Sequence, residues 1–231
     1  MSLTDEIENR QESLELQTYS DAIIVGVGGI GSWVALMLGL SGQVSNLILI
    51  DPDIVESSNL NRTPFGIKDI GAPKVEAVKY LILERRVDID IDIIQSKTND
   101  VVKSKILELL HAPNPVIVDC RDDVYKDLYD IPARLYYKVG YDGLDITIDG
   151  DPENTPVWGE GTGYRVIPSY VGSALLAACL VVNDILIDYY DEDSDEYREF
   201  NYKTNDEGKL NCPLTFSVPD ILDSISKCVG S

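Results

Sequence analysis

The sequence predicts an α/β fold of the Rossmann type, with a doubly wound, mostly parallel sheet, flanking helices and a small C-terminal appendage. Residues 22–25 form a short, entirely apolar run that ends at a glycine, as a buried parallel strand does. A glycine-rich turn then leads into a predicted helix at residues 31–40, and a second apolar strand is predicted at residues 47–50. This order of strand, turn, helix and strand is typical of doubly wound sheets.

Further along the chain, helices and strands are predicted to alternate. Helices are expected at residues 74–86, 101–110, 123–137 and 169–190, and strands at residues 89–94, 115–119 and 144–148. Residues 4–17 are also expected to be helical, because Thr4 is a good N-cap and acidic residues follow it. Pro132 is expected to shorten or kink the helix that contains it.

The long connection at residues 52–73 is unusual for such a fold, and long connections of this kind are often functional. Residues 1–190, with an N-terminal helical segment at 1–18, are expected to form one domain. Residues 191–231 are expected to form a C-terminal extension of strand, turn and helix. The acidic run at 188–199 is most simply a solvated hinge between the two.

Composition and charge exclude several kinds of function. Of the 231 residues 44% are hydrophobic, which permits a sizeable core and argues against disorder. A formal net charge of −21 disfavours binding to nucleic acid, which is itself a polyanion. Apolar stretches are too short to span a membrane, and the charged first 17 residues do not resemble a signal peptide. We therefore expect a cytoplasmic protein that binds neither nucleic acid nor membrane.

Cysteine and histidine are too few and too scattered for a zinc site of the usual spacing. The four cysteines are Cys120, Cys179, Cys212 and Cys228, with no C-x-x-C pair, and the one histidine is His111. Cys120 and Cys179 lie in apolar segments and are expected to behave as small core residues. The absence of a disulfide pattern fits a reducing compartment.

The glycine-rich turn is the first motif that indicates a ligand. Residues 26–31, Gly-Val-Gly-Gly-Ile-Gly, match the pattern G-x-G-x-x-G between a strand and a helix. Gly26, Gly28, Gly29 and Gly31 permit a tight turn and let the backbone approach a phosphate, while the helix N-terminus offers unpaired N–H groups to an anion. The motif predicts a nucleotide-binding site, for which NAD would be the default ligand.

Asp51, at the end of the second predicted strand, is the candidate for binding a ribose. An acidic residue at this position accepts hydrogen bonds from ribose hydroxyls, and its distance from the glycines suits that role. The alternative is that Asp51 only forms a turn beside Pro52.

Three further motifs accompany the glycine turn. Residues 51–62 read D-P-D-I-V-E-S-S-N-L-N-R, residues 70–74 read I-G-A-P-K, and residues 119–122 read D-C-R-D. Together they resemble the E1-like (ThiF/MoeB) superfamily of ubiquitin-activating adenylyltransferases, whose patterns are G-x-G-G-x-G, D-x-D-x-V-x-x-S-N-L-x-R, I-G-x-x-K and D-x-x-D. The resemblance covers about residues 9–190 and makes residues 1–190 the expected adenylation domain. Its S-N-L-x-R block is far more specific than the glycine turn.

The resemblance implies roles for the residues that match its motifs. Asp51 would hold the ribose of ATP, and Asp53 would lie beside it in the nucleotide site. Asn59, Arg62 and Lys74 would contact the phosphates. The alternative for Lys74 is an ordinary lysine in the first turn of a helix, although a cation there is opposed by the helix dipole.

Two further residues are assigned by the same resemblance. Asp122 would be the acid linked to Mg²⁺, and is the metal ligand of the predicted site. Residues 9–11, Asn-Arg-Gln, resemble a motif whose arginine reaches into the partner subunit's ATP site, which makes Arg10 the candidate for that role. The alternative for Arg10 is a solvated helix arginine. The predicted catalytic residues are therefore Arg10, Arg62, Lys74 and Asp122.

The implied reaction is Mg²⁺- and ATP-dependent adenylation of a protein's C-terminal carboxylate, with release of pyrophosphate. Because the attacking carboxylate and the α-phosphate are both anionic, the reaction needs positioned positive charge more than it needs a base. Arg62, Lys74, Mg²⁺ and the helix N-terminus after Gly31 would supply that charge. The carboxylate is already ionised at neutral pH, so no histidine is required. ATP and Mg²⁺ are the expected ligands, and no zinc is expected.

The chain departs from the family pattern in its cysteines. Many members attack the acyl-adenylate with a cysteine from the loop before the Pro-Ser-x-x-G helix, but residues 151–166 contain no cysteine. Cys212 is the one cysteine in a polar setting, and it is either a working thiol or a surface or structural residue. The loop is expected instead to clamp the partner's tail, with its glycines supplying flexibility and Trp158 and Tyr164 apolar contact.

The partner that the resemblance implies is a β-grasp, ubiquitin-like or sulfur-carrier protein with a flexible C-terminal tail, bound by a homodimer of this chain. Other functions stay open: the same chemistry on a tRNA or a peptide, an NAD-dependent oxidoreductase, and a non-catalytic scaffold. The negative charge argues against tRNA. An oxidoreductase would leave the three motifs after the glycine turn without a joint purpose. A scaffold is disfavoured because the phosphate-site residues are present.

Overall fold

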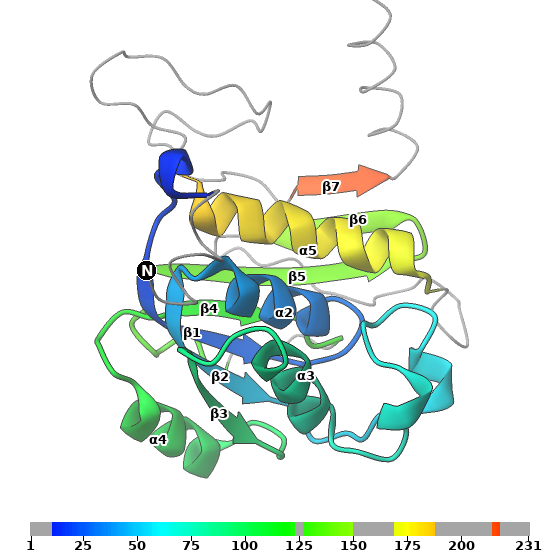
Figure 1. Cartoon of the computed structure of the whole chain (residues 1–231), viewed down its shortest axis with the longest axis horizontal. Helices are drawn as coiled ribbons and strands as arrows, with labels where there is room; N and C mark the ends of the chain where they lie inside the picture. The colour runs from blue at the N-terminus through cyan, green and yellow to red at the C-terminus, as the bar shows by residue number, and fades with distance from the viewer. Residues whose placement is uncertain (1–10, 123–126, 150–168, 188–213, 218–231) are drawn as a thin grey trace, which may run out of the picture.

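A computed structural model describes residues 11–122, 127–149, 169–187 and 214–217 (Figure 1). The strands of this part are β1 (Tyr19–Val25), β2 (Val44–Ile50), β3 (Asp90–Ile94), β4 (Val116–Asp119), β5 (Leu135–Asp142), β6 (Asp145–Asp149) and β7 (Leu214–Ser217). They form one sheet in the order β3-β2-β1-β4-β5-β6-β7. Neighbours from β3 to β5 are parallel, while β6 is antiparallel to both β5 and β7. This confirms the predicted Rossmann-like, mostly parallel sheet.

Helices lie on both faces of the sheet. The described α-helices are α2 (Gly31–Ser41), α3 (Lys74–Leu83), α4 (Asp100–Leu109) and α5 (Val171–Leu186), and the 3₁₀ helices are η1 (Glu12–Leu14), η2 (Ser57–Asn59) and η3 (Ile67–Asp69). Helices α2, α3 and α5 pack into one hydrophobic core, while α4 packs into a second core on the opposite face (Figure 1). The sheet is therefore doubly wound, as the sequence predicts.

Strand β2 explains why the central strands read as continuous apolar runs. Leu47 and Leu49 pack into the core under α2, α3 and α5, and Ile48 and Ile50 pack into the core on the α4 side. Because both faces of a parallel sheet are covered, both sets of alternate side chains must be apolar.

The strand order reverses at β1, which lies between β2 and β4. In open α/β sheets, ligands bind at the carboxyl ends of the strands next to such a reversal. The chain segments that leave β1, β2 and β4 at this edge begin with Gly26, Asp51 and Cys120. The predicted site residues therefore come from three separate parts of the sequence to one edge of the sheet.

The predicted helix at residues 123–137 is wrong over its C-terminal part. Strand β5 begins at Leu135 and pairs with β4, Tyr136 lies opposite Ile117, and the backbone N–H of Arg134 donates to the carbonyl of Pro115. Alternate β5 side chains enter the two cores, as the burial of Tyr136 on one face and Tyr137 on the other shows. Pairing with a central strand overrides a local helical preference.

The predicted N-terminal helix is also wrong within the described residues. The 3₁₀ helix η1 ends at Leu14, and the next residue, Glu15, adopts a left-handed conformation with φ 52°. The backbone N–H of Gln17 then donates to the carbonyl of Leu186 at the end of α5, so this segment is tied to the helix layer rather than continuing as a helix. Residues 1–10, including Arg10, lie outside the described residues.

Other differences are smaller. Helix α3 ends at Leu83 rather than at residue 86. Strand β7 comes from the predicted C-terminal extension and pairs with β6 at the edge of the main sheet (Figure 1). The loop at 151–166, the acidic hinge and Cys212 lie outside the described residues, and the domain division at residue 190 stays a prediction. Among the described helices, none combines the length and the apolarity that a membrane span requires.

Candidate nucleotide-binding site

The glycine turn packs against the chain that leaves β4. Gly26 has a positive φ of 82°, and a Cβ at Gly26 would lie 3.0 Å from backbone atoms of Cys120 and Arg121. A Cβ at Gly31 would lie only 1.9 Å from the carbonyl oxygen of Gly26. These two glycines are therefore required by the close approach of backbone segments, as the motif predicts.

The other two glycines of the turn border open space or side chains. A Cβ at Gly28 would have no neighbour within 4 Å, so the backbone there is accessible to a ligand. A Cβ at Gly29 would lie 2.9 Å from the hydroxyl of Tyr141 and 3.4 Å from Cδ of Arg62. Helix α2 begins at Gly31 with no side-chain cap, which leaves its positive end facing this turn.

Asp51 connects the glycine turn to the second motif. One carboxylate oxygen accepts a 2.6 Å hydrogen bond from the backbone N–H of Val27, and the other accepts one of 2.8 Å from the N–H of Asp53. Burial raises the pKa of Asp51, against the opposing effect of the Lys74 ammonium, whose Nζ is 4.0 Å away, and of the two backbone hydrogen bonds. Asp51 therefore does more than form a turn beside Pro52, because its hydrogen bond from Val27 fixes the backbone of the glycine turn.

Lys74 lies at the first residue of α3 and points back toward the end of β2. Its Nζ is 2.8 Å from a carboxylate oxygen of Asp53, and its side chain is largely buried. The backbone there is fixed by hydrogen bonds from Lys74 N to Asp53 O and from Val55 N to Ala72 O. A lysine at a helix N-terminus is disfavoured by the dipole, and here two carboxylates offset that effect.

Arg62 reaches the site from the end of the segment around η2. Its Nη1 donates to the carbonyl of Ser58 at 2.6 Å and to Oδ1 of Asn61 at 3.0 Å, and its own carbonyl accepts from Nε1 of Trp33 in α2 at 3.0 Å. The aliphatic part of the side chain lies over Gly29. Arg62 is therefore tied to α2 by a hydrogen bond, and its side chain lies against Gly29 of the glycine turn.

Asn59 is buried and has a local structural role in the described structure. Its Oδ1 accepts a 3.1 Å hydrogen bond from the backbone N–H of Glu56 and so caps η2. Its carbonyl accepts from the hydroxyl of Thr63 and from the N–H of Arg62. These contacts shape the turn that carries Arg62. A direct phosphate contact from Asn59 stays a prediction.

Tyr141, on β5, is a residue of the site that the motifs did not predict. Besides lying against Gly29, it hydrogen-bonds with Ser169 and Arg62, and these bonds partly offset the rise in its pKa that burial causes. The negative charge of Asp122, which is exposed, adds to that rise. A tyrosine at the end of a strand next to the glycine turn is not distinctive in sequence.

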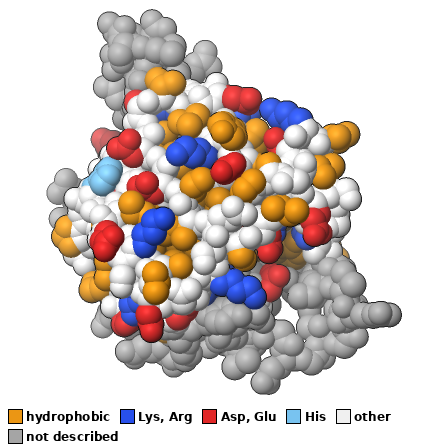
Figure 2. All heavy atoms as spheres, turned by 90° about the horizontal axis from the view of Figure 1, so that it is seen from below, with side chains coloured by type: hydrophobic (Ala, Val, Ile, Leu, Met, Phe, Trp, Pro, Cys, Tyr) orange, Lys and Arg blue, Asp and Glu red, His pale blue; other side chains and the backbone are white. Residues whose placement is uncertain are grey.

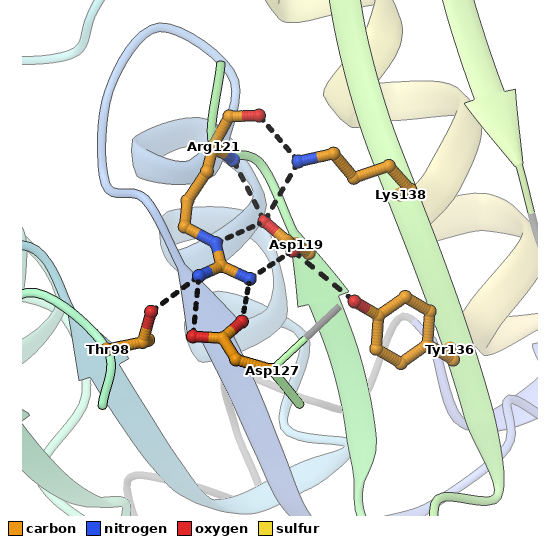
Figure 3. Close-up of polar contacts among 6 residues, drawn as sticks. All are labelled: Thr98, Asp119, Arg121, Asp127, Tyr136 and Lys138. Atoms are coloured by element: carbon orange, nitrogen blue, oxygen red, sulfur yellow. Dashed lines mark hydrogen bonds and ion pairs between the residues drawn. The ribbon is translucent and has the colours of Figure 1, made fainter. Parts of the chain in front are cut away.

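A buried network of charges lies behind the turn, at the carboxyl end of β4 and beside the first half of β5 (Figure 3). Asp119 accepts two hydrogen bonds from the guanidinium of Arg121, at 2.9 and 2.6 Å, and one of 3.2 Å from Nζ of Lys138. Arg121 also contacts Asp127 at 2.9 Å and Thr98 at 2.5 Å.

Burial has different effects on the members of this network. It lowers the pKa of Lys138, although Asp119 opposes the shift. Burial alone would raise the pKa of Asp127, but hydrogen bonds from Arg121 and Thr98 hold it below its ordinary value. Burial and the adjacent Asp119 also raise the pKa of the Cys120 thiol, so Cys120 stays protonated and is not a nucleophile.

The structure thus brings most of the predicted residues together. The four glycines, Asp51, Asp53, Arg62 and Lys74 lie around one turn, and Asp122 follows β4 beside it. Among the described residues, no group of three or more His, Cys, Asp and Glu side chains is arranged to hold a metal ion. Figure 2 shows a face on which Lys and Arg side chains lie apart among acidic and apolar ones, without a continuous basic stripe.

Fold and site together define a Rossmann-type domain with the motif set of an E1-like adenylyltransferase. The chain belongs to the ThiF family, whose model matches residues 5–134. This confirms the family that the sequence motifs predict.

Individual relatives differ in what they act on. The chain is 33% identical over 107 residues to the sulfur carrier protein ThiS adenylyltransferase of Escherichia coli, covering 46% of this chain and 40% of that protein. It is 36% identical over 81 residues to the tRNA threonylcarbamoyladenosine dehydratase of Bacillus subtilis, covering 35% of this chain and 32% of that protein. The chain therefore aligns with less than half the length of these relatives.

A similar fold occurs in the crystal structure of E. coli MccB with ATP. The likeness has a TM-score of 0.57 and 24% sequence identity, and covers 76% of this chain and 56% of that one. It supports the fold assignment.

Proposed function

We propose that this chain binds ATP with Mg²⁺ at the glycine turn and adenylates the C-terminal carboxylate of a ubiquitin-like or sulfur-carrier protein. The carboxylate oxygen attacks the α-phosphorus, the bond to the bridging oxygen breaks, and pyrophosphate leaves with the electron pair. The observation that carries the proposal is the placement of two cations around the glycine turn: the Arg62 side chain lies against Gly29, and the Lys74 ammonium lies 4.0 Å from Asp51, which holds the turn through Val27.

Each residue has a task that fits its surroundings. Arg62 lies over Gly29 and would contact the phosphates of ATP, while Lys74 would approach them from the β2 end. Charge of this kind, fixed before the reaction, stabilises the transition state of phosphoryl and nucleotidyl transfer. Gly28 leaves the backbone open to a phosphate oxygen, and Asp51 would accept hydrogen bonds from the ribose through its remaining lone pairs.

The residues present also fit a magnesium ion. Mg²⁺ is usually held by one or two carboxylates together with substrate phosphates and waters, rather than by a cage of protein ligands. The exposed carboxylate of Asp122 at the carboxyl end of β4 matches that requirement. A bound Mg²⁺ would neutralise phosphate charge. Asp122 would orient it, and Lys74 would remain available to the nucleotide.

The choice of a protein carboxylate as substrate rests on the relative that adenylates ThiS and on the charge of the chain. A net charge of −21 disfavours a tRNA substrate, because tRNA is itself a polyanion. We also propose a homodimer in which Arg10 reaches the partner's site.

The test is calorimetric titration of ATP and of NAD, each with Mg²⁺, into the wild type and two variants. Arg62→Ala should weaken ATP binding about ten- to a hundredfold, the effect of losing a charged hydrogen bond of about 1.5–3 kcal/mol. Arg85→Ala is the matched control, because Arg85 also donates from Nη1 to a carbonyl four residues earlier at 2.6 Å, but outside the site. Tight NAD binding that the Arg62→Ala substitution does not weaken would refute the proposal.

If ATP binds, exchange of labelled pyrophosphate into ATP identifies the substrate. Exchange that requires a ubiquitin-like protein with a C-terminal Gly-Gly supports the protein-carboxylate assignment. Exchange that requires a short peptide or tRNA instead would overturn that assignment while keeping the adenylation chemistry.

A further inference from the structure

The buried network behind the glycine turn suggests a role for Lys138 that the motifs do not assign. Lys138 lies in β5 with 1% of its surface exposed, beside Asp119, which is fully buried at the end of β4. Its Nζ donates a 2.6 Å hydrogen bond to the carbonyl of Arg121 and forms a 3.2 Å ion pair with Asp119 (Figure 3).

Stability alone is a weak explanation for such a network. Moving charged groups out of water is costly, and well-packed apolar side chains of similar volume often stabilise a protein as much or more. The network also includes a 3.3 Å hydrogen bond from the hydroxyl of Tyr136 to Asp119, so a third β4–β5 side chain is committed to it. All of these hydrogen bonds form together only when the backbone at the end of β4 adopts one particular conformation.

The backbone that the network holds is the short segment at residues 119–122. The Arg121 carbonyl accepts from Lys138, while the Arg121 N–H donates to Oδ1 of Asp119 at 3.0 Å. One residue earlier, the Cys120 N–H donates to the carbonyl of Val25 at 2.7 Å. Both the backbone N–H and the backbone carbonyl of Arg121 are therefore fixed by buried charged groups.

This segment forms one wall of the glycine turn. The Cβ position of Gly26 lies 3.0 Å from the backbone of Cys120 and Arg121, and that of Gly31 lies 3.4 Å from the Cβ of Cys120. The next residue, Asp122, is exposed. A shift of the Arg121 carbonyl would therefore move both the wall of the turn and the attachment point of Asp122.

We propose that Lys138 is a positioning residue of the nucleotide site, which holds the Arg121 carbonyl so that the glycine turn and Asp122 are placed for Mg²⁺ and ATP. This role rests on the proposed function. Lys138 acts through the backbone, since its buried ammonium contacts Asp119 and Arg121 rather than the open side of the turn.

The test compares Lys138→Met with Lys79→Met. Lys79 is the matched control, because its Nζ also donates to a backbone carbonyl at 2.6 Å, that of Ile91, but in the helix α3 and strand β3 region. ATP affinity is measured by calorimetry at several Mg²⁺ concentrations. Amide hydrogen exchange of peptides that cover residues 119–122 is measured in the same proteins without nucleotide.

Lys138→Met should weaken ATP binding at least tenfold, raise the Mg²⁺ concentration needed for half-maximal affinity, and speed exchange at residues 119–122. Lys79→Met should change ATP affinity less than twofold and leave exchange at 119–122 unaltered. Where Lys138→Met does not fold, Lys138→Gln keeps a shorter, uncharged donor. It should show the same pattern, reduced in size.

Lys138 variants that bind Mg²⁺ and ATP as Lys79→Met does would overturn the positioning role, even with faster exchange at residues 119–122. A wild type that binds no ATP would instead remove the proposed function, and the positioning role with it. The Arg62→Ala and wild-type titrations separate the two failures, because they do not depend on Lys138.

Discussion

Two glycines of the turn, Gly28 and Gly31, should respond differently to the same substitution by alanine. A Cβ at Gly31 would lie 1.9 Å from the Gly26 carbonyl oxygen, more than 1 Å inside the shortest spacing that real Cβ atoms show. The clashing atom belongs to the backbone, so no side-chain rotation relieves it. A Cβ at Gly28 meets nothing within 4 Å.

The expected magnitude follows from these distances. Overpacking of this kind destabilises by about 1–3 kcal/mol or more, whereas the gain in helix propensity from glycine to alanine is at most about 1 kcal/mol. Gly31→Ala should therefore lower the free energy of unfolding by about 2 kcal/mol, or the melting temperature by about 4–8 °C in a domain of this size. Gly28→Ala should leave stability within about 0.5 kcal/mol, since it touches nothing.

The assays are urea unfolding and ATP titration of both variants. Gly28→Ala should bind ATP at least tenfold more weakly at unchanged stability, because its methyl group occupies the space left for a phosphate. Gly31→Ala with wild-type stability would refute the packing argument. Gly28→Ala with wild-type ATP affinity would show that the nucleotide does not approach the turn at this position.

The remaining predictions concern a hydroxyl and a carboxylate. Tyr141→Phe removes the hydroxyl beside Gly29 and its bonds to Arg62 and Ser169, so ATP affinity should fall about two- to tenfold, the effect of one neutral hydrogen bond, with unchanged urea unfolding. An unchanged Kd would exclude Tyr141 from the site. The pKa of Asp127 is held below its ordinary value of 3.8, so its contribution to stability is present above that value and is lost as the pH falls below it, toward and through the lower pKa of the folded state. Asp127→Asn should therefore lose less stability than the wild type between neutral and acidic pH, measured by urea unfolding. If Asp127→Asn and the wild type lost equal stability over this pH range, the explanation would be contradicted.

Where sequence reasoning failed, a distant partner decided the local structure. Residues 135–137 were predicted to be helical, yet β5 starts at Leu135 because its backbone pairs with β4. Lys138 stands alone in an apolar strand, which is a signal for a buried partner, but the sequence does not say that the partner is Asp119. Tyr141 likewise enters the site only because β5 ends beside the glycine turn.

The sequence by itself determined the doubly wound sheet and most of the candidate site. Apolar runs, the glycine-rich pattern and the other motifs with fixed spacing are local features of the chain, so they can be recognised without coordinates. Tertiary structure decided how far Asp51 is engaged by the protein itself, and which charges meet behind the turn. Those properties depend on contacts between strands far apart in the chain, because burial and ion pairing are set by the packed sheet rather than by sequence neighbours.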